Sequence, residues 1–80
     1  MRFSTVVFRF RNTPHLANVY FSEALNYYTV YFEDIDLILE FGGKAKYDKI
    51  QGLRLLKAGK DVEALKLSVI KQIEELETVC

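Results

Sequence analysis

The acidic segment in the middle of the chain holds the side chains whose spacing comes nearest to a metal site. In an extended segment, Asp34 and Asp36 point to the same side, as two ligands of a divalent cation must. Glu33 and Glu40 complete the cluster. Two carboxylates are few for magnesium unless substrate phosphates complete the coordination. We therefore predict a charged turn followed by solvent-facing strand positions, with no metal and no cofactor.

The other residue types that enzymes use are scarce. Histidine can act as a general base near neutral pH, but no nucleophile or orienting carboxylate lies beside His15, the one histidine. Cys80 is the one cysteine and the last residue, where fraying prevents the geometry that catalysis needs. Gly42-Gly43-Lys44 lacks the upstream glycine and the following Ser or Thr of a phosphate-binding loop, so we expect a β-turn. These absences predict a protein that is not an enzyme.

Aromatic residues crowd into thirteen positions between residues 20 and 32. Strand residues alternate and helix residues rotate, so these rings cannot all face one core. Tyrosine suits interfaces, because its large rigid body is apolar and its tip is polar. Leu67 adds a second ridge, because it lies off the main apolar stripe of the last segment. We predict a small regulatory module that binds a protein partner or itself, as a homodimer, through Tyr20, Tyr27, Tyr28, Tyr31 and Leu67. A tightly packed core whose tyrosine hydroxyls reach solvent stays open as the alternative.

The charge is balanced overall but unevenly placed. Eleven Lys and Arg match eleven Asp and Glu, so the net charge favours neither a polyanion nor a membrane surface. Residues 44–60, however, carry six bases against Asp48 alone, and acidic segments lie on both sides. With two arginines of the first segment, this band could contact phosphates. The alternative function is therefore nucleic-acid binding through Arg9, Arg11, Lys44, Lys46, Lys49, Arg54, Lys57 and Lys60.

Two forms of nucleic-acid binding differ in how well they fit. A recognition helix should present basic or amide groups to a groove, but the last segment presents Glu63, Glu74 and Glu75. Single-strand binding on a sheet fits better, because arginines and tyrosines can pair with phosphates and stack on bases. Solvated lysines on a helix flank remain the alternative for the basic band.

The elements that position these residues begin with a strand over residues 2–10, rich in β-branched and aromatic side chains. It places Val6 and Phe8 on one face and Val7 and Arg9 on the wetter one. Thr13-Pro14 then has the residue types of a helix start, a hydroxyl cap before a proline. Apolar residues follow at helical spacing, so we predict a helix over residues 16–25. A strand through residues 19–21 is the competing interpretation, because aromatic residues favour strands.

The rest of the chain predicts two strands and two helices. Tyr27–Phe32 and Ile35–Phe41 have strand character, and Glu33-Asp34 would form the turn between them. Asp48 can cap a helix that ends at Gly59, with Ile50, Leu53 and Leu56 facing inward. Asp61 can cap the last helix, whose apolar stripe is Val62, Leu65, Val69, Ile73 and Leu76. Whether residues 44–47 add a short strand is undecided.

The predicted fold is α+β: a small antiparallel sheet packed against helices, in the order β-α-β-β-α-α. A β-meander followed by a C-terminal helical hairpin is the second choice. Eighty residues, half of them hydrophobic, correspond to one ordered domain over residues 1–80. The longest uncharged run is eleven residues, and a membrane span needs about 20. With no secretion signal in sight, we expect a cytoplasmic protein.

Overall fold

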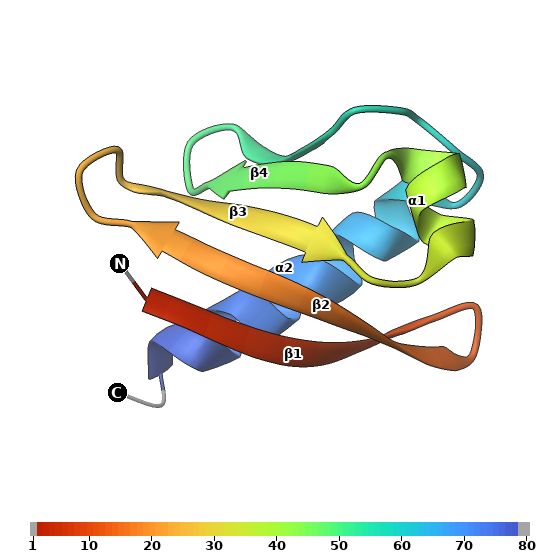
Figure 1. Cartoon of the computed structure of the whole chain (residues 1–80), viewed down its shortest axis with the longest axis horizontal. Coiled ribbons are helices and arrows are strands. Elements are labelled where there is room, and N and C mark those ends of the chain that lie inside the picture. The colour runs from red at the N-terminus through yellow and green to blue at the C-terminus, as the bar shows by residue number, and fades with distance from the viewer. Residues whose placement is uncertain (1, 79–80) are drawn as a thin grey trace.

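The computed structural model describes residues 2–78, which form a five-stranded antiparallel sheet and two helices, an α+β fold (Figure 1). The strand order is β1-β2-β3-β4-β5, so each strand pairs with the next along the chain. Helix α1 lies between β3 and β4 in the sequence, and α2 crosses behind the sheet. The elements are β1 (Arg2–Phe10), β2 (Thr13–Ser22), β3 (Tyr27–Phe32), α1 (Ile35–Phe41), β4 (Lys44–Asp48), β5 (Gly52–Leu55) and α2 (Val62–Thr78).

Three predicted elements are confirmed, namely the strands β1 and β3 and the last helix, and the α+β class with them. The predicted order β-α-β-β-α-α differs from the structure, in which α1 separates β3 from β4 and a single helix ends the described chain. The undecided segment 44–47 belongs to β4. Cys80 lies outside the described residues.

The helix predicted over residues 16–25 is wrong, because Thr13–Ser22 is strand β2. The cause lies in the turn before it. Arg11 and Asn12 both have positive φ, 54° and 61°. That conformation belongs to the two-residue hairpin turn whose twist matches two paired strands. The chain is therefore sent straight back along β1, and Thr13 follows a hairpin turn instead of capping a helix.

Pairing on both sides sorts the residues of β2 to the two faces of the sheet. Ala17 and Val19 are buried, whereas Leu16 and Tyr20 are exposed. The apolar residues that matched helical spacing thus divide between a buried and an exposed face. Pro14 is tolerated because β3 pairs with β2 only from Ala17 onward.

The strand predicted over residues 35–41 is also wrong, because Ile35–Phe41 is helix α1. A carboxylate of Asp34 accepts a hydrogen bond from the backbone N–H of Asp36 (2.9 Å) and so caps the helix. Leu37 and Phe41, four residues apart, point together into the core. The N-cap and this spacing favour a helix. Asp34, considered above as a metal ligand, caps this helix.

The helix predicted from Asp48 to Gly59 is a turn followed by β5, so the helical hairpin is wrong as well. The Asp48 carboxylate does accept backbone hydrogen bonds, from Ile50 (2.9 Å) and Gln51 (2.7 Å), but these close a turn. Gly52 then adopts a φ of +75°, which glycine accepts at little cost, and begins a strand. Ile50, expected to face inward, is 95% exposed.

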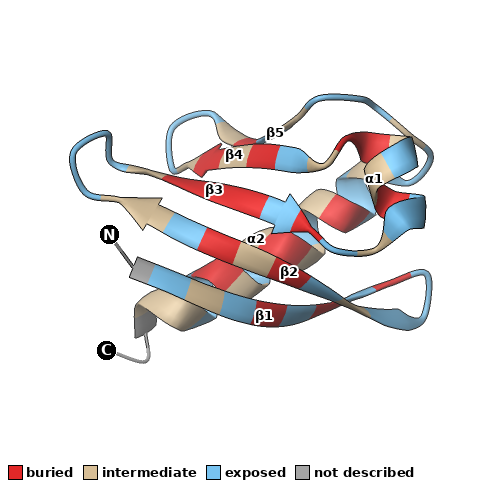
Figure 2. Cartoon of the chain, viewed as in Figure 1, coloured by how far each residue is buried: buried red, intermediate tan, exposed pale blue. Residues whose placement is uncertain are grey.

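The core lies between α2 and one face of the sheet (Figure 2). Leu65, Val69 and Ile73 of α2 are completely buried, as the apolar stripe predicted. The strands contribute their alternate residues, among them Phe8 and Val30. The Ser68 hydroxyl donates to the backbone carbonyl of Arg9 (2.7 Å) and ties the helix to β1. Among residues 2–78, neither helix is long and apolar enough to span a bilayer.

We predict that Ile73→Ala lowers the free energy of unfolding by about 2–5 kcal/mol, because it leaves a cavity in the fully buried stripe. Leu67→Ala on the same helix is the control, since Leu67 is 70% exposed. Urea unfolding followed by circular dichroism measures both variants. Equal destabilisation of the two would contradict this orientation of α2.

Candidate functional site

The uncovered face of the sheet is the candidate site, because α2 covers only the opposite face. Alternation places every second strand residue on it, and the strand register aligns them in rows. One row crosses all five strands, and a second crosses four. We call this surface the open face. The first row is Phe3, Tyr20, Thr29, Lys46 and Arg54, and the second is Thr5, Asn18, Tyr31 and Lys44.

Aromatic rings cover the part of the open face formed by β1, β2 and β3. The rings of Phe3 and Tyr20 lie 4.7 Å apart between centroids, and those of Tyr20 and Tyr31 lie 5.7 Å apart, edge to face. Phe3 is 53% exposed, and both tyrosines are more than a third exposed. Tyr27 lies on the same face, two residues before Thr29. These rings present surface to solvent that a planar ligand can stack on.

Basic side chains border the aromatic part of the open face. These are Lys44, Lys46 and Arg54 of β4 and β5. Arg9 is also on the open face, but it lies near the first hairpin turn, six residues along β1 from Phe3. The Lys46 ammonium lies 5.3 Å from the centroid of the Tyr27 ring, within cation–π range.

The charges of the molecule are divided between its two sides. Asp48 is the one acidic residue at an open-face strand position, and its carboxylate lies 3.5 Å from the Arg54 guanidinium. Helix α2, on the other side of the sheet, carries four glutamates and only two lysines between residues 62 and 78. The open face is therefore the basic side of the described chain.

The structure brings together three of the five residues predicted to bind a partner. Tyr20, Tyr27 and Tyr31 share the open face. Tyr28 lies on the core face, and its hydroxyl donates to Glu77 of α2 (3.0 Å). Leu67 is exposed on α2, on the other side of the sheet from the tyrosines.

The predicted basic residues divide in the same way. Arg9, Lys44, Lys46 and Arg54 are on the open face, as described above. Lys57 and Lys49 lie elsewhere: the Lys57 ammonium donates to the carbonyl of Leu39 (3.4 Å), and that of Lys49 lies 3.5 Å from Glu77. Lys60 lies in the loop before α2, where its backbone carbonyl accepts from Arg11 (3.0 Å).

Arg11 has a structural role at the corner where the first hairpin meets both helices. Its guanidinium donates two hydrogen bonds to the Glu40 carboxylate of α1 (2.9 and 2.6 Å) and lies 3.4 Å from Asp61. The hydrogen bonds from Arg11 hold the pKa of Glu40 below its ordinary value. The same pair raises the pKa of Arg11. Arg11 thus joins β1, α1 and the start of α2.

A hollow of about 590 Å³ lies within the aromatic part of the open face. Thr29 of β3 and Tyr20 of β2, directly opposite each other, both line it, and so does Leu25 of the β2–β3 loop. Sequence reasoning missed Phe3, Asn18 and Thr29 as parts of this surface. The signal for Phe3 was present in the alternation of β1, which puts it on the face of Val7 and Arg9. The hollow is lined by Phe3, Asn18, Tyr20, Ser22, Leu25, Tyr27, Thr29 and Tyr31.

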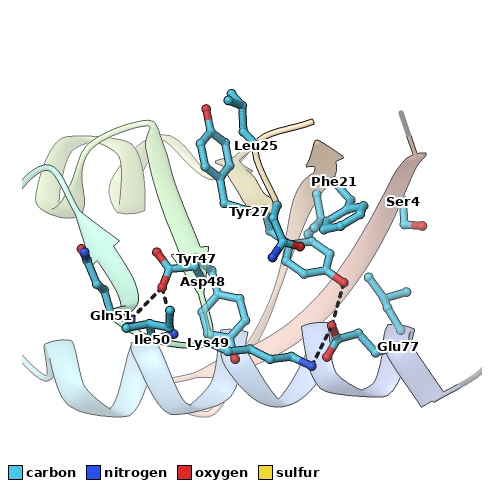
Figure 3. A pocket seen from close by; sticks show the side chains of 14 residues that line it. Ser4, Phe21, Leu25, Tyr27, Tyr47, Asp48, Lys49, Ile50, Gln51 and Glu77 are labelled. Carbon is cyan, nitrogen blue, oxygen red and sulfur yellow. Dashed lines mark hydrogen bonds and ion pairs between the residues drawn. The ribbon is translucent and has the colours of Figure 1, made fainter. Parts of the chain in front are cut away.

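A second hollow, of about 780 Å³, lies at the end of the sheet near the last turns of α2 (Figure 3). Glu77 lies at its base, held by the Tyr28 hydroxyl and by Lys49. Burial, and then the negative charges of Glu74, Glu77 and Asp48, raise the pKa of the Tyr47 phenol. Leu25 and Tyr27 line both hollows and separate them.

The fold supplies His15 with the orienting carboxylate that its sequence neighbours do not. Asp34 Oδ2 lies 2.8 Å from His15 Nδ1, and the imidazole stacks against Phe8. The other oxygen of Asp34 caps α1. Among residues 2–78, no three His, Cys, Asp or Glu side chains are grouped so that they could hold a metal. His15 and Asp34 therefore link β2 to α1.

No protein-family model, no curated protein and no solved structure matches this chain. The function is therefore inferred from the open face itself.

We predict that Glu40→Gln lowers stability at neutral pH and that its effect disappears in acid. The pKa of Glu40 is lowered in the folded state, so its ionisation stabilises the fold above the ordinary value of 4.5. That contribution is lost as the pH falls through the lowered pKa. Unfolding followed from pH 7 to acid measures the difference between variant and wild type. Glu23→Gln, in the exposed β2–β3 loop, is the control, and matching pH profiles for both variants would refute the role of Arg11.

Proposed function

We propose that this protein is a non-catalytic binding module that holds single-stranded nucleic acid on the open face of its sheet. The observation that carries the proposal is the coincidence of two groups on one uncovered surface. Exposed aromatic rings lie on β1 to β3, and basic side chains of β4 and β5 border them. Three of the tyrosines and four of the basic residues come from the two predicted site sets, which the fold merges into one.

The chemistry of a single strand matches these two groups. Each base has an apolar planar face, and stacking on an aromatic side chain contributes about 1–3 kcal/mol per base. The phosphates between the bases need cations. Lys44 and Lys46 are directly opposite Tyr31 and Thr29 in the register, so phosphate contacts lie one strand away from the stacking surface, about 5 Å.

Duplex DNA is a poorer match. Its bases are stacked within the helix and reach a protein only through their edges in the grooves. The long helix that would enter a groove is α2, whose outward residues include Glu63, Glu74 and Glu75. The open face carries exposed aromatic rings on which unstacked bases can lie.

The proposal includes no catalytic step. Asp34, the best general-base partner in the described chain, is already bonded to His15 and to the backbone of α1. Glu40 is bonded to Arg11. These carboxylates hold elements together, which is a sufficient physical reason for their positions.

A protein partner, or a second copy of the chain in a homodimer, is the second candidate for the same surface. Exposed apolar side chains favour it, because Val7 and Leu16, which are paired in the register, are each about half exposed on the open face. In this case two sheets would pack face to face and bury the tyrosines. The basic residues would then lie at the rim.

We predict that wild-type protein binds short RNA or DNA single strands and that Lys44→Glu and Arg54→Glu each weaken binding about tenfold, because each reverses a phosphate contact. Fluorescence anisotropy with labelled mixed-sequence oligonucleotides of about 10 nucleotides measures the affinity. Affinity should also fall steeply as salt is raised. Lys71→Glu on α2 is the matched control and should bind like wild type. Equal losses in all three variants would show that only net charge matters.

We predict that Tyr31→Ala weakens strand binding about fivefold or more, the loss of one stacking interaction, while the protein keeps its fold and mass. Circular dichroism and sedimentation velocity are the checks on fold and mass. If wild type is a dimer that Tyr31→Ala converts to a monomer, and no oligonucleotide binds, the second candidate replaces the first.

A further inference from the structure

We infer that the hollow lined by Thr29 is a pocket for one nucleobase of the bound strand. The inference rests on the proposed function and adds to it a defined site for one base. Thr29 has a shorter side chain than the residues around it. The residue is at the middle of the open face and is only 9% exposed, although no helix covers that face.

Four longer side chains surround Thr29. Tyr20 and Lys46 are its partners in the register on the two sides, and Tyr27 and Tyr31 lie two residues away along β3. A short side chain ringed by long ones leaves a depression whose floor is Thr29. Its volume of about 590 Å³ is within the range of small-molecule sites, about 300–1,000 Å³.

The walls of the hollow match a base in both shape and chemistry. Aromatic rings on several sides can stack on a planar ligand, and Phe3 and Leu25 close its outer rim. Asn18, Ser22 and Thr29 provide amide and hydroxyl groups that donate to and accept from a base edge. The Thr5 hydroxyl donates to Asn18 Oδ1 (2.9 Å), which orients the carboxamide and leaves its NH₂ group as the donor.

The charge beside the hollow identifies the rest of the ligand. Lys46 is directly opposite Thr29, with Lys44 and Arg54 as its neighbours on the basic side of the open face. A ligand with an aromatic plane, a hydrogen-bonding edge and an adjacent negative charge is a nucleotide. The phosphates of the proposed strand would lie on this same basic side, so one strand can place a base in the hollow and its phosphates beside the basic residues.

Filling the floor of the hollow tests the pocket. Thr29→Ile keeps a β-branched side chain suited to a strand, but it adds bulk and removes the hydroxyl. We expect it to weaken strand binding about fivefold or more, the loss of one stacked base. Val7→Ile is the matched control, because it adds a methyl group to the same face outside the lining of the hollow. Circular dichroism confirms that both variants fold.

The strand itself provides the complementary test. Oligonucleotides in which one base at a time is removed, leaving an abasic site, are bound to wild-type protein. We expect one position whose base, when removed, lowers the affinity about fivefold or more. Thr29→Ile should cause no further loss with that abasic strand, because both changes remove the same contact between base and pocket. Competition by a free mononucleotide at high concentration would show that the hollow also accepts the unit outside a strand, and it would support the pocket.

The outcomes separate the two levels of the proposal. If wild type binds no oligonucleotide, the proposed function fails and the pocket fails with it. If wild type binds and Lys44→Glu weakens binding, but Thr29→Ile does not, the function stands and the base pocket is overturned. If Thr29→Ile does not fold, the abasic series decides alone, and equal small losses at every position overturn the pocket.

Discussion

The packing of one amphipathic helix on one face of the sheet is the constraint on which the rest of this structure depends. Leu65, Val69 and Ile73 are wholly buried, and they bury the inward residues of the strands with them. Within residues 2–78 no second layer covers the other face, which therefore carries whatever side chains the alternation leaves there. In this chain those are rings and cations. Because each strand alternates strictly, core and open face are specified together, and a shift of one residue would exchange them.

The corner around Arg11 shows how a small domain aligns its elements. The hairpin turn, α1 and the start of α2 come from distant parts of the sequence, and one guanidinium joins all three. His15 and Asp34 make a similar connection between β2 and α1. The charged residues of these two clusters, which could be taken for catalytic groups, instead hold the strands and helices together.

The sequence indicated the kinds of residue that form the candidate site, tyrosines and basic residues, but not which of them lie together on one face. Tyr20, Tyr27 and Tyr31 were expected to bind a partner, and Arg9, Lys44, Lys46 and Arg54 were expected to meet phosphates. Their union on one face required the strand register, which places Thr29 opposite Lys46 and Tyr31 opposite Lys44. Tyr28 shows the limit of composition, because it neighbours Tyr27 in the chain yet turns to the core. Thr29 carried no signal at all, since its importance lies in being smaller than its neighbours.

By itself the sequence determined the elements whose signal is periodic and unopposed: β1, β3 and the buried stripe of α2. Each of these elements has alternating or helically spaced apolar residues within one continuous segment, so the local sequence is enough to predict it. Only the tertiary structure decided between helix and strand for residues 13–22, 35–41 and 52–55. In the first, a hairpin turn overrode helical spacing; in the second, a cap and two core residues overrode strand character. In the third, a glycine with positive φ began a strand where a helix was expected. In each segment, pairing partners and burial outweighed the preference expressed by the local sequence.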